Sequence, residues 1–324
     1  MRLVANPHYR DRSRGPYLKV IVFRNDVPPA QALELICTTE GEFDIVTEVP
    51  PADAAKVKAS KHAKLVSIDA VRSVAGVVNR SAEGCPLADV RARQALNHAI
   101  DRKKLVAEAM AGHADSLGGL TPPCVPTYAL SQSPYSHDPH KAAELWRAAG
   151  GSGASRPLRI AAFADWGEVA RSAAEDLRKA LGVAVEVAVL DREGELRARR
   201  RMAERAPPEW DVLILMQGCQ AADGAPLELR RAFVGDDGEY RAGPPVPAFD
   251  ALYADLLRQT APLAQGKVAL AMDRLVYDEA LALFLCAPHA LYAVNREVEF
   301  TPYRTTFELA ECRVGKGHWS RRRP

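Results

Sequence analysis

The sequence predicts an α/β protein in which helices cover the faces of a sheet. Short apolar segments with strand character occur at 158–163, 183–189 and 211–216, and amphipathic helical patterns at 169–181 and 195–204 separate them. Such alternation indicates a sheet with helices packed on its faces. A chain of 324 residues with 48% hydrophobic side chains can bury the large core that this architecture needs.

The first eighty or so residues are predicted to combine short strands with two helices. Pro28-Pro29 opens a helical pattern, because proline suits the first turn of a helix, and Leu33 and Ile36 share its apolar face. A second, shorter helix is expected at 52–59. Segments of strand character are expected at 17–24, 43–46, 63–70 and 73–79.

The middle of the chain contains a helix–aspartate–helix pattern. Residues 89–100 carry apolar side chains at helical spacing, and Asp101 is expected to cap a second helix at 102–110. Asp138-Pro139 is likewise expected to begin a helix. Later segments are predicted as helices at 249–259 and 267–285, with Cys286 in a buried helix-like stretch, followed by a strand at 291–295.

Composition narrows the function classes. The formal net charge of +2 gives no basis for binding nucleic acid or a membrane surface. The six cysteines are scattered without metal-ligand spacing, so neither a metal nor a cofactor is expected. The sequence His137-Asp138-Pro139-His140 favours a helix start over a metal site. The most apolar stretch, 279–287, is too short to cross a bilayer.

Catalytic motifs are missing from the sequence. It contains no GxSxG elbow, no phosphate-binding Walker loop, no GxGxxG after a strand and no HExxH. A hydrolase would need a nucleophile and a base in one pocket, and no motif supplies them. The sequence therefore predicts a protein that is not an enzyme.

One segment carries a specific resemblance. Residues 89–106 read DVRARQALNHAIDRKKLV and are similar to a signature of the family 5 (peptide/nickel-type) substrate-binding proteins of ABC transporters. Further elements that resemble those of the family occur in the expected order along nearly the whole chain. They are Asn6 to Arg10, Gly41 to Ile45, Val77 to Asn79, and His137 to Ala142.

The resemblance implies a periplasmic-binding-protein-like lobe, with a mixed sheet flanked by helices, plus a C-terminal return segment of the other lobe. Residues 1–26 would connect from a first lobe, 27–290 would form the second lobe, and 291–324 would return. The family places a first lobe ahead of Asn6, and the N-terminus does not read as a signal peptide. The chain is therefore expected to be a C-terminal half that lacks the first lobe.

The resemblance also implies partners and a binding site. Partners would be a small-molecule or peptide solute and ABC permease subunits, in the periplasm, for a protein that is not membrane-embedded. Peptide-binding members carry G-W-x-x-D-x-x-x-P after a strand, with the Asp on the peptide amine. Here the stretch is 218–226, with Cys219 at the Trp position and Asp223 one place nearer the proline. The expected ligand-binding residues are Asp223, Gln217, Gln220 and Asn79.

Two further interpretations stay open beside capture of a solute by hinge closure of two lobes. The chain could be a truncated or inactive lobe used only for protein interaction, or a hydrolase on an α/β scaffold. Gln217 and Gln220 could also simply cap backbone groups after a strand. The family takes peptides, nickel complexes, oligosaccharides and other solutes, so kinship does not choose the ligand.

Overall fold

The computed structural model describes residues 1–11, 13, 15–124, 133–218, 233–303 and 309–322, and these form two compact units. Met1–Ala70 and His289–Pro324 form the first, here called the terminal unit. Val71–Pro288 forms the second, called the central unit. The chain thus passes from one unit to the other at Ala70/Val71 and again at Pro288/His289.

The central unit is built on a mixed sheet. Arg72–Val78 (β5) runs antiparallel to Val212–Gly218 (β9) and to the first half of Ala282–Asn295 (β10). Leu158–Phe163 (β7) runs parallel to both β9 and Val185–Leu190 (β8). Ala114–Ser116 (β6) pairs with β10. The mixed sheet confirms the predicted fold class.

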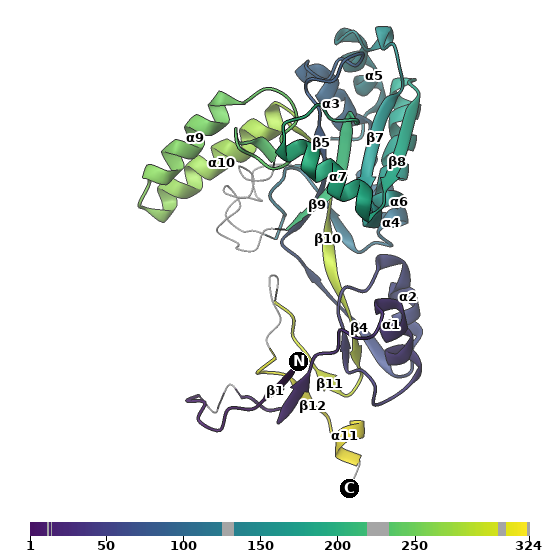
Figure 1. Ribbon diagram of the computed structural model, residues 1–324, viewed down its shortest axis with the longest axis vertical. Helices are drawn as coiled ribbons and strands as arrows, with labels where there is room; N and C mark the ends of the chain where they lie inside the picture. Colours follow the sequence, from purple (N-terminus) through teal and green to yellow (C-terminus); the bar gives the residue numbers. More distant parts are fainter. Residues whose placement is uncertain (12, 14, 125–132, 219–232, 304–308, 323–324) are drawn as a thin grey trace. The chain divides into compact units, whose positions relative to one another are not determined.

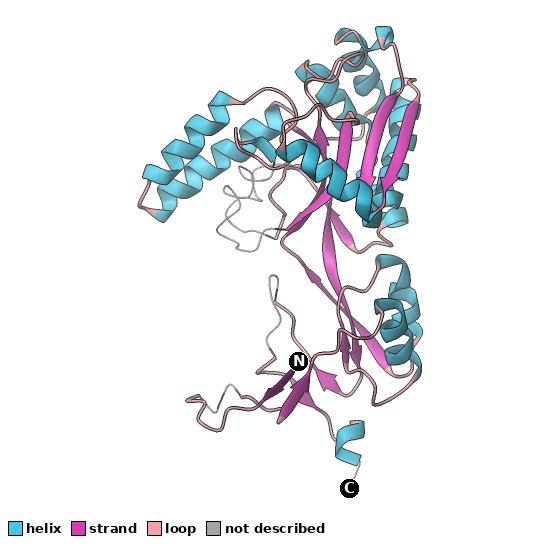
Figure 2. Cartoon of the chain, in the orientation of Figure 1, coloured by secondary structure: helices cyan, strands magenta, loops and turns pink. Residues whose placement is uncertain are grey.

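Helices cover both faces of this sheet (Figures 1 and 2). Alternate residues of β9 serve the two faces: Val212 and Ile214 join one hydrophobic core, and Leu213 and Leu215 join the other. The helices on the first core are Val90–Ala99 (α3), Arg102–Ala109 (α4), Pro139–Ala148 (α5) and Gly167–Leu181 (α6). Those on the second are Arg192–Ala203 (α7), Pro247–Arg258 (α9) and Pro262–Asp278 (α10).

The aspartate caps predicted at Asp101 and Asp138 are confirmed, and Asp89 is a further cap that was not predicted. The side chains of Asp89, Asp101 and Asp138 accept hydrogen bonds from the backbone N–H groups of Arg91, Lys104 and Lys141 at 2.8, 3.0 and 2.9 Å. Each bond satisfies a donor that the first turn of a helix leaves free.

The predicted helix at 267–285 is wrong in its last third. α10 ends at Asp278, and β10 begins at Ala282. Ala280 has a φ of 45°, in the left-handed region, and this turn separates the two elements. The segment is continuously apolar because β10 is buried on both faces, and such a run has no period that distinguishes a strand from a helix. Cys286 is buried in this strand.

In the terminal unit, residues 27–70 belong with the C-terminal segment that begins at His289. Pro29–Thr38 (α1) and Ala54–Ala59 (α2) share one core with Leu291 and Ala293 of β10. Its strands are Arg2–Val4 (β1), Val20–Val22 (β2), Ile45–Val46 (β3), Ala63–Asp69 (β4), Val298–Glu299 (β11) and Arg313–Val314 (β12), and Trp319–Arg322 (α11) follows.

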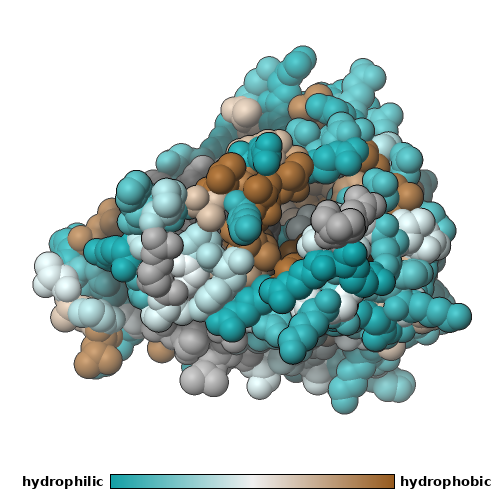
Figure 3. Space-filling view, turned by 90° about the horizontal axis from the view of Figure 1, so that it is seen from below, coloured by the Kyte–Doolittle hydropathy of each residue, from teal (hydrophilic) through white to brown (hydrophobic). Residues whose placement is uncertain are grey.

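The β1–β2 ribbon of the terminal unit leaves apolar side chains exposed. Val4 is 69% exposed and Val22 59%, and the residues of both strands lie outside the four described hydrophobic cores. Apolar side chains among hydrophilic ones are visible on the face seen in Figure 3. A two-stranded ribbon has little stability of its own. The apolar side chains of this ribbon are therefore not covered by any of the described cores.

Candidate functional site

The four predicted ligand-binding residues fall into three groups. Gln220 and Asp223 lie outside the described residues. Gln217 lies near the C-terminal end of β9, and Asn79 directly follows β5.

Gln217 lies near the C-terminal end of β9, an interior strand of the central sheet. Its side chain is half-buried, with Nε2 at 3.5 Å from the carbonyl oxygen of Gly218. In the antiparallel pairing it lies opposite Ser73, and the neighbouring exposed Gly218 lies opposite Arg72. This end of the β5–β9 pair is called the Gln217 edge.

Asn79 holds a turn within the protein. Its side chain is 4% exposed. Nδ2 donates to the carbonyl oxygen of Trp210 at 3.3 Å, and Oδ1 accepts from the backbone N–H of Ser81 at 3.1 Å. Its backbone N–H donates to the carbonyl oxygen of Asp211 at 2.8 Å. The amide thus fastens the end of β5 to the start of β9.

The structure does not bring Asn79 and Gln217 together. Asn79 lies opposite Asp211, six residues before Gln217 on β9, so the two are separated by roughly 20 Å at the rise of a strand. Residues that follow parallel strands meet at one edge of a sheet, but β5 and β9 are antiparallel. Asn79 and Gln217, each expected just after a strand, therefore lie at opposite ends of the β5–β9 pair.

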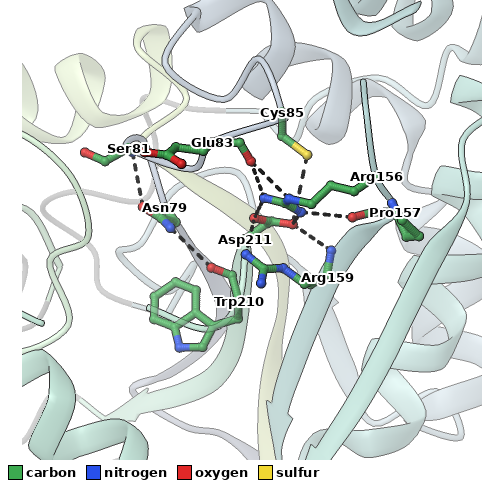
Figure 4. A network of polar contacts seen from close by, with 9 residues as sticks. All are labelled: Asn79, Ser81, Glu83, Cys85, Arg156, Pro157, Arg159, Trp210 and Asp211. Carbon is green, nitrogen blue, oxygen red and sulfur yellow. Dashed lines mark hydrogen bonds and ion pairs between the residues drawn. The ribbon is translucent and has the colours of Figure 1, made fainter. Parts of the chain in front are cut away.

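A dense ionic network closes the Asn79 end (Figure 4). The Asp211 carboxylate is fully buried and accepts two hydrogen bonds from the Arg156 guanidinium, at 2.6 and 2.7 Å. The backbone N–H of Arg159 donates a third at 2.8 Å. Burial raises the pKa of Asp211, but the bonds from Arg156 and Arg159 together outweigh it and lower that pKa below its ordinary value. Arg156 also donates to the Glu83 carbonyl oxygen, so the network anchors the 80–88 loop.

The Gln217 edge is connected differently. The buried Ser73 hydroxyl, opposite Gln217, donates to the Leu120 carbonyl oxygen at 2.6 Å. The next residue, Thr121, donates through Oγ1 to the Asp273 carboxyl of α10 at 3.2 Å. Asp273 is 2% exposed, and burial raises its pKa to about 7 although the bonds from Thr121 oppose the rise. Hydrogen bonds of Ser73 and Thr121 thus connect the Gln217 edge, through the 120–121 segment, to the buried carboxyl of Asp273.

Asp273 was not among the residues predicted from the sequence. A signal for it exists, because Asp273 lies among Ala269, Met272 and Val276 on the buried face of α10. A lone carboxyl on the apolar face of an amphipathic helix is unusual and marks a position with a specific partner.

The described residues contain neither a cluster of metal ligands nor a membrane-spanning helix. Within the described ranges, no group of three or more His, Cys, Asp and Glu side chains is arranged to hold a metal ion. Among the same residues, no helix has both the length and the apolar character needed to cross a membrane.

Curated relatives match part of the chain. The glutathione-binding protein GsiB of Salmonella choleraesuis (strain SC-B67) is 34% identical over 110 residues, which cover 34% of this chain and 21% of that protein. The same protein from Escherichia coli O1:K1 / APEC is 33% identical over the same length. The match spans about a fifth of the length of these relatives.

Solved structures share the fold over most of the chain. NikA from Brucella suis, in complex with Fe(III)-EDTA, superposes with a TM-score of 0.75 at 19% identity, over 92% of this chain and 62% of that one. DppA from Helicobacter pylori, in complex with the peptide STSA, gives 0.71 at 18% identity, over 97% and 60%. The chain therefore spans about three fifths of these proteins, and it shares their periplasmic-binding-protein-like fold.

A family model settles the kinship predicted from segment 89–106. The model described as bacterial extracellular solute-binding proteins, family 5 middle, matches residues 1–236, which include β5, β9 and the Gln217 edge. GsiB is named as a glutathione-binding protein, and DppA as an ABC transporter-associated periplasmic binding protein. The chain belongs to the family 5 bacterial extracellular solute-binding proteins.

Proposed function

We propose that this chain is the solute-binding component of an ABC importer, or the larger part of one, and that the Gln217 edge contacts the solute. The family match over residues 1–236 carries the proposal. Proteins of this family are periplasmic or extracellular, and we propose the periplasm as the site of action and ABC permease subunits as the partners.

The chemistry of the edge supports a contact role. Solute sites in binding proteins use a few placed polar groups, among them backbone groups and amide side chains. The Gln217 edge offers the half-buried Gln217 amide and the exposed backbone of Gly218. Gln220 and Asp223, which follow in the sequence, are proposed as further contacts. We leave Asn79 out of this surface because it lies at the other end of the strand pair.

The proposed solute is a peptide or a peptide-like molecule. Relatives and neighbours are named for glutathione, for the dipeptide Met-Leu and for the peptide STSA, whereas NikA proteins hold a nickel–histidine or an iron–EDTA complex. Binding is reversible, and no bond is made or broken. A carboxylate such as Asp223 would suit the amine of a peptide.

A thermal-shift and calorimetric panel tests the proposal. The panel contains glutathione, Met-Leu, tetrapeptides, nickel–histidine and oligosaccharides, each added to the whole chain. We expect one class to raise the unfolding temperature, because a ligand that binds only the folded state stabilises it. Gln217→Ala should weaken that response, whereas the matched exposed control Gln265→Ala should not. Equal responses from both variants would contradict the proposed contact surface.

A second function is favoured by one observation, the exposed apolar β1–β2 ribbon. On this alternative the chain serves only in protein interaction, as a lobe that binds no solute. No shift with any member of the panel, together with concentration-dependent association that Val4→Lys and Val22→Lys abolish, would favour this alternative over solute capture.

A further inference from the structure

A buried acid without a described ionic partner joins two parts of the central unit. Asp273 is 2% exposed in the second half of α10. Its described polar partner is Thr121, which donates through its hydroxyl at 3.2 Å and also through its backbone. Within the described residues no ion pair to Asp273 is present. An ionised carboxylate in such a place carries a large desolvation cost.

The segment that Asp273 holds is closely fitted to it. A Cβ atom added to Gly119 would lie 3.3 Å from both carboxyl oxygens, so the backbone of this segment passes directly beside the acid. Leu120, between Gly119 and Thr121, is fastened on its other side to Ser73 of β5. Asp273 therefore fixes the 117–121 segment to α10 just behind the strand that carries the Gln217 edge.

Charged groups on the surrounding elements are engaged elsewhere. On α10, Arg274 pairs with Asp278 at 3.3 Å, and on α9 Asp255 pairs with Arg258 at 3.6 Å. Asp250 accepts from the backbone of Asp236. Neither these groups nor Tyr277 and Arg72 perturb the titration of Asp273, which depends on its burial and on Thr121.

We propose that the contact between Asp273 and the 117–121 segment is a pH-sensitive clasp, closed when the acid is protonated and loosened when it ionises. The closed contact excludes water from the carboxyl, so ionisation favours states in which this contact opens and the carboxylate becomes hydrated. The clasp acts within the central unit and does not depend on which solute the protein binds.

The direction of the pH dependence follows from the pKa. The pKa of Asp273 is about 7 in the closed contact, against 3.8 for an ordinary aspartate, which describes the open state. The closed state thus binds the proton more tightly, and its stabilisation is complete below about pH 4. It is lost progressively as the pH rises toward 7 and then stays constant.

Hydrogen exchange across pH tests the clasp. Amide protection in 117–121, corrected for intrinsic exchange, should fall by up to roughly tenfold per pH unit between about pH 4 and 7. Protection of 212–215 in β9 serves as the internal control. In Asp273→Asn the 117–121 protection should be independent of pH. A flat profile in the natural protein, or the same slope in Asp273→Asn, would overturn the proposal.

A direct titration keeps the proposal testable if the variant does not fold. The 13C resonance of the Asp273 carboxyl in the natural protein should titrate near neutral pH. A midpoint near the ordinary aspartate value would show that the contact does not hold the proton, and the clasp would then be rejected.

Discussion

The two ends of the β5–β9 pair are each backed by a buried aspartate in opposite surroundings. At the Asn79 end, Asp211 is held by the guanidinium of Arg156 and the backbone of Arg159. At the Gln217 edge, Asp273 has only Thr121 as a described polar partner. The first aspartate is stabilised as an anion, and the second is stabilised as an acid.

This difference in surroundings bears on what each end of the strand pair contributes. A fully bonded ionic network fixes one geometry, and breaking it leaves charges unpaired. A buried carboxyl group with a pKa near neutral lowers the stability of the folded protein at neutral pH. Such groups are found more often at functional positions than elsewhere. We propose from this comparison that the Asn79 end, with Asp211, serves folding stability and that the Gln217 edge serves solute contact.

The largest expected loss of stability is at the Asn79 end, where Asp211 lies. Asp211→Asn should lower the free energy of unfolding at pH 7 by on the order of 3 kcal/mol, because it leaves Arg156 without its buried anion. The loss should shrink as the pH falls below the ordinary carboxyl value near 4, where Asp211 itself becomes protonated. Urea unfolding at pH 7 and pH 3 measures both. A loss that is the same at both pH values would remove the ionic explanation.

Asp273→Asn should act in the opposite direction. At pH 8 the variant should be more stable than the natural protein by up to about 4 kcal/mol, because it removes the penalty of a buried carboxylate. At pH 4 the two should be nearly equally stable, because Asp273 is then neutral in the folded protein and its burial carries no penalty for an anion. The same urea measurements at the two pH values decide this, and destabilisation at pH 8 would contradict the comparison.

Ser73→Ala should have a smaller effect. Its buried hydroxyl donates to the Leu120 carbonyl oxygen, and loss of that bond should cost about 1 kcal/mol. Ser172→Ala is the matched control, because the buried Ser172 hydroxyl has no described hydrogen-bond partner. Its removal should be nearly neutral. Equal losses in the two variants, measured by urea unfolding, would show that the Ser73 bond does not fasten the edge.

Gln217→Ala should have the smallest effect on stability, within about 0.5 kcal/mol, because the side chain is only half-buried and belongs to none of the described hydrophobic cores. Its thermal unfolding curve should therefore overlay that of the natural protein in the absence of solute. A large loss of stability would place Gln217 in the structural framework instead.

Local signals in the sequence predicted much of the fold. Asp101 and Asp138 cap helices as expected because capping depends on a few neighbouring residues. The segment at 282–285 was misassigned because a strand buried on both faces has no hydrophobic period. Residues 282–285 form a strand because they pair with β5, which is distant in the sequence. A single sequence does not reveal such pairing.

The candidate site was predictable only in part. Gln217 lies within β9 near its C-terminal end, because the strand runs two residues beyond the end expected from the sequence. The antiparallel pairing that carries Asn79 to the other end comes from tertiary structure. Asp273 could have been noticed as a carboxyl on an apolar helix face, but its partner Thr121 is more than 150 residues away in the chain. Gln220 and Asp223 lie outside the described residues and stay predictions.

The most direct test of the central claim is isothermal titration of the solute that shifts unfolding most in the panel. It compares the natural chain with Gln217→Ala and with Gln265→Ala. Solute contact at the Gln217 edge predicts a dissociation constant raised roughly tenfold in Gln217→Ala, the worth of about one hydrogen bond, with Gln265→Ala unchanged. Identical affinities for all three proteins would contradict the claim.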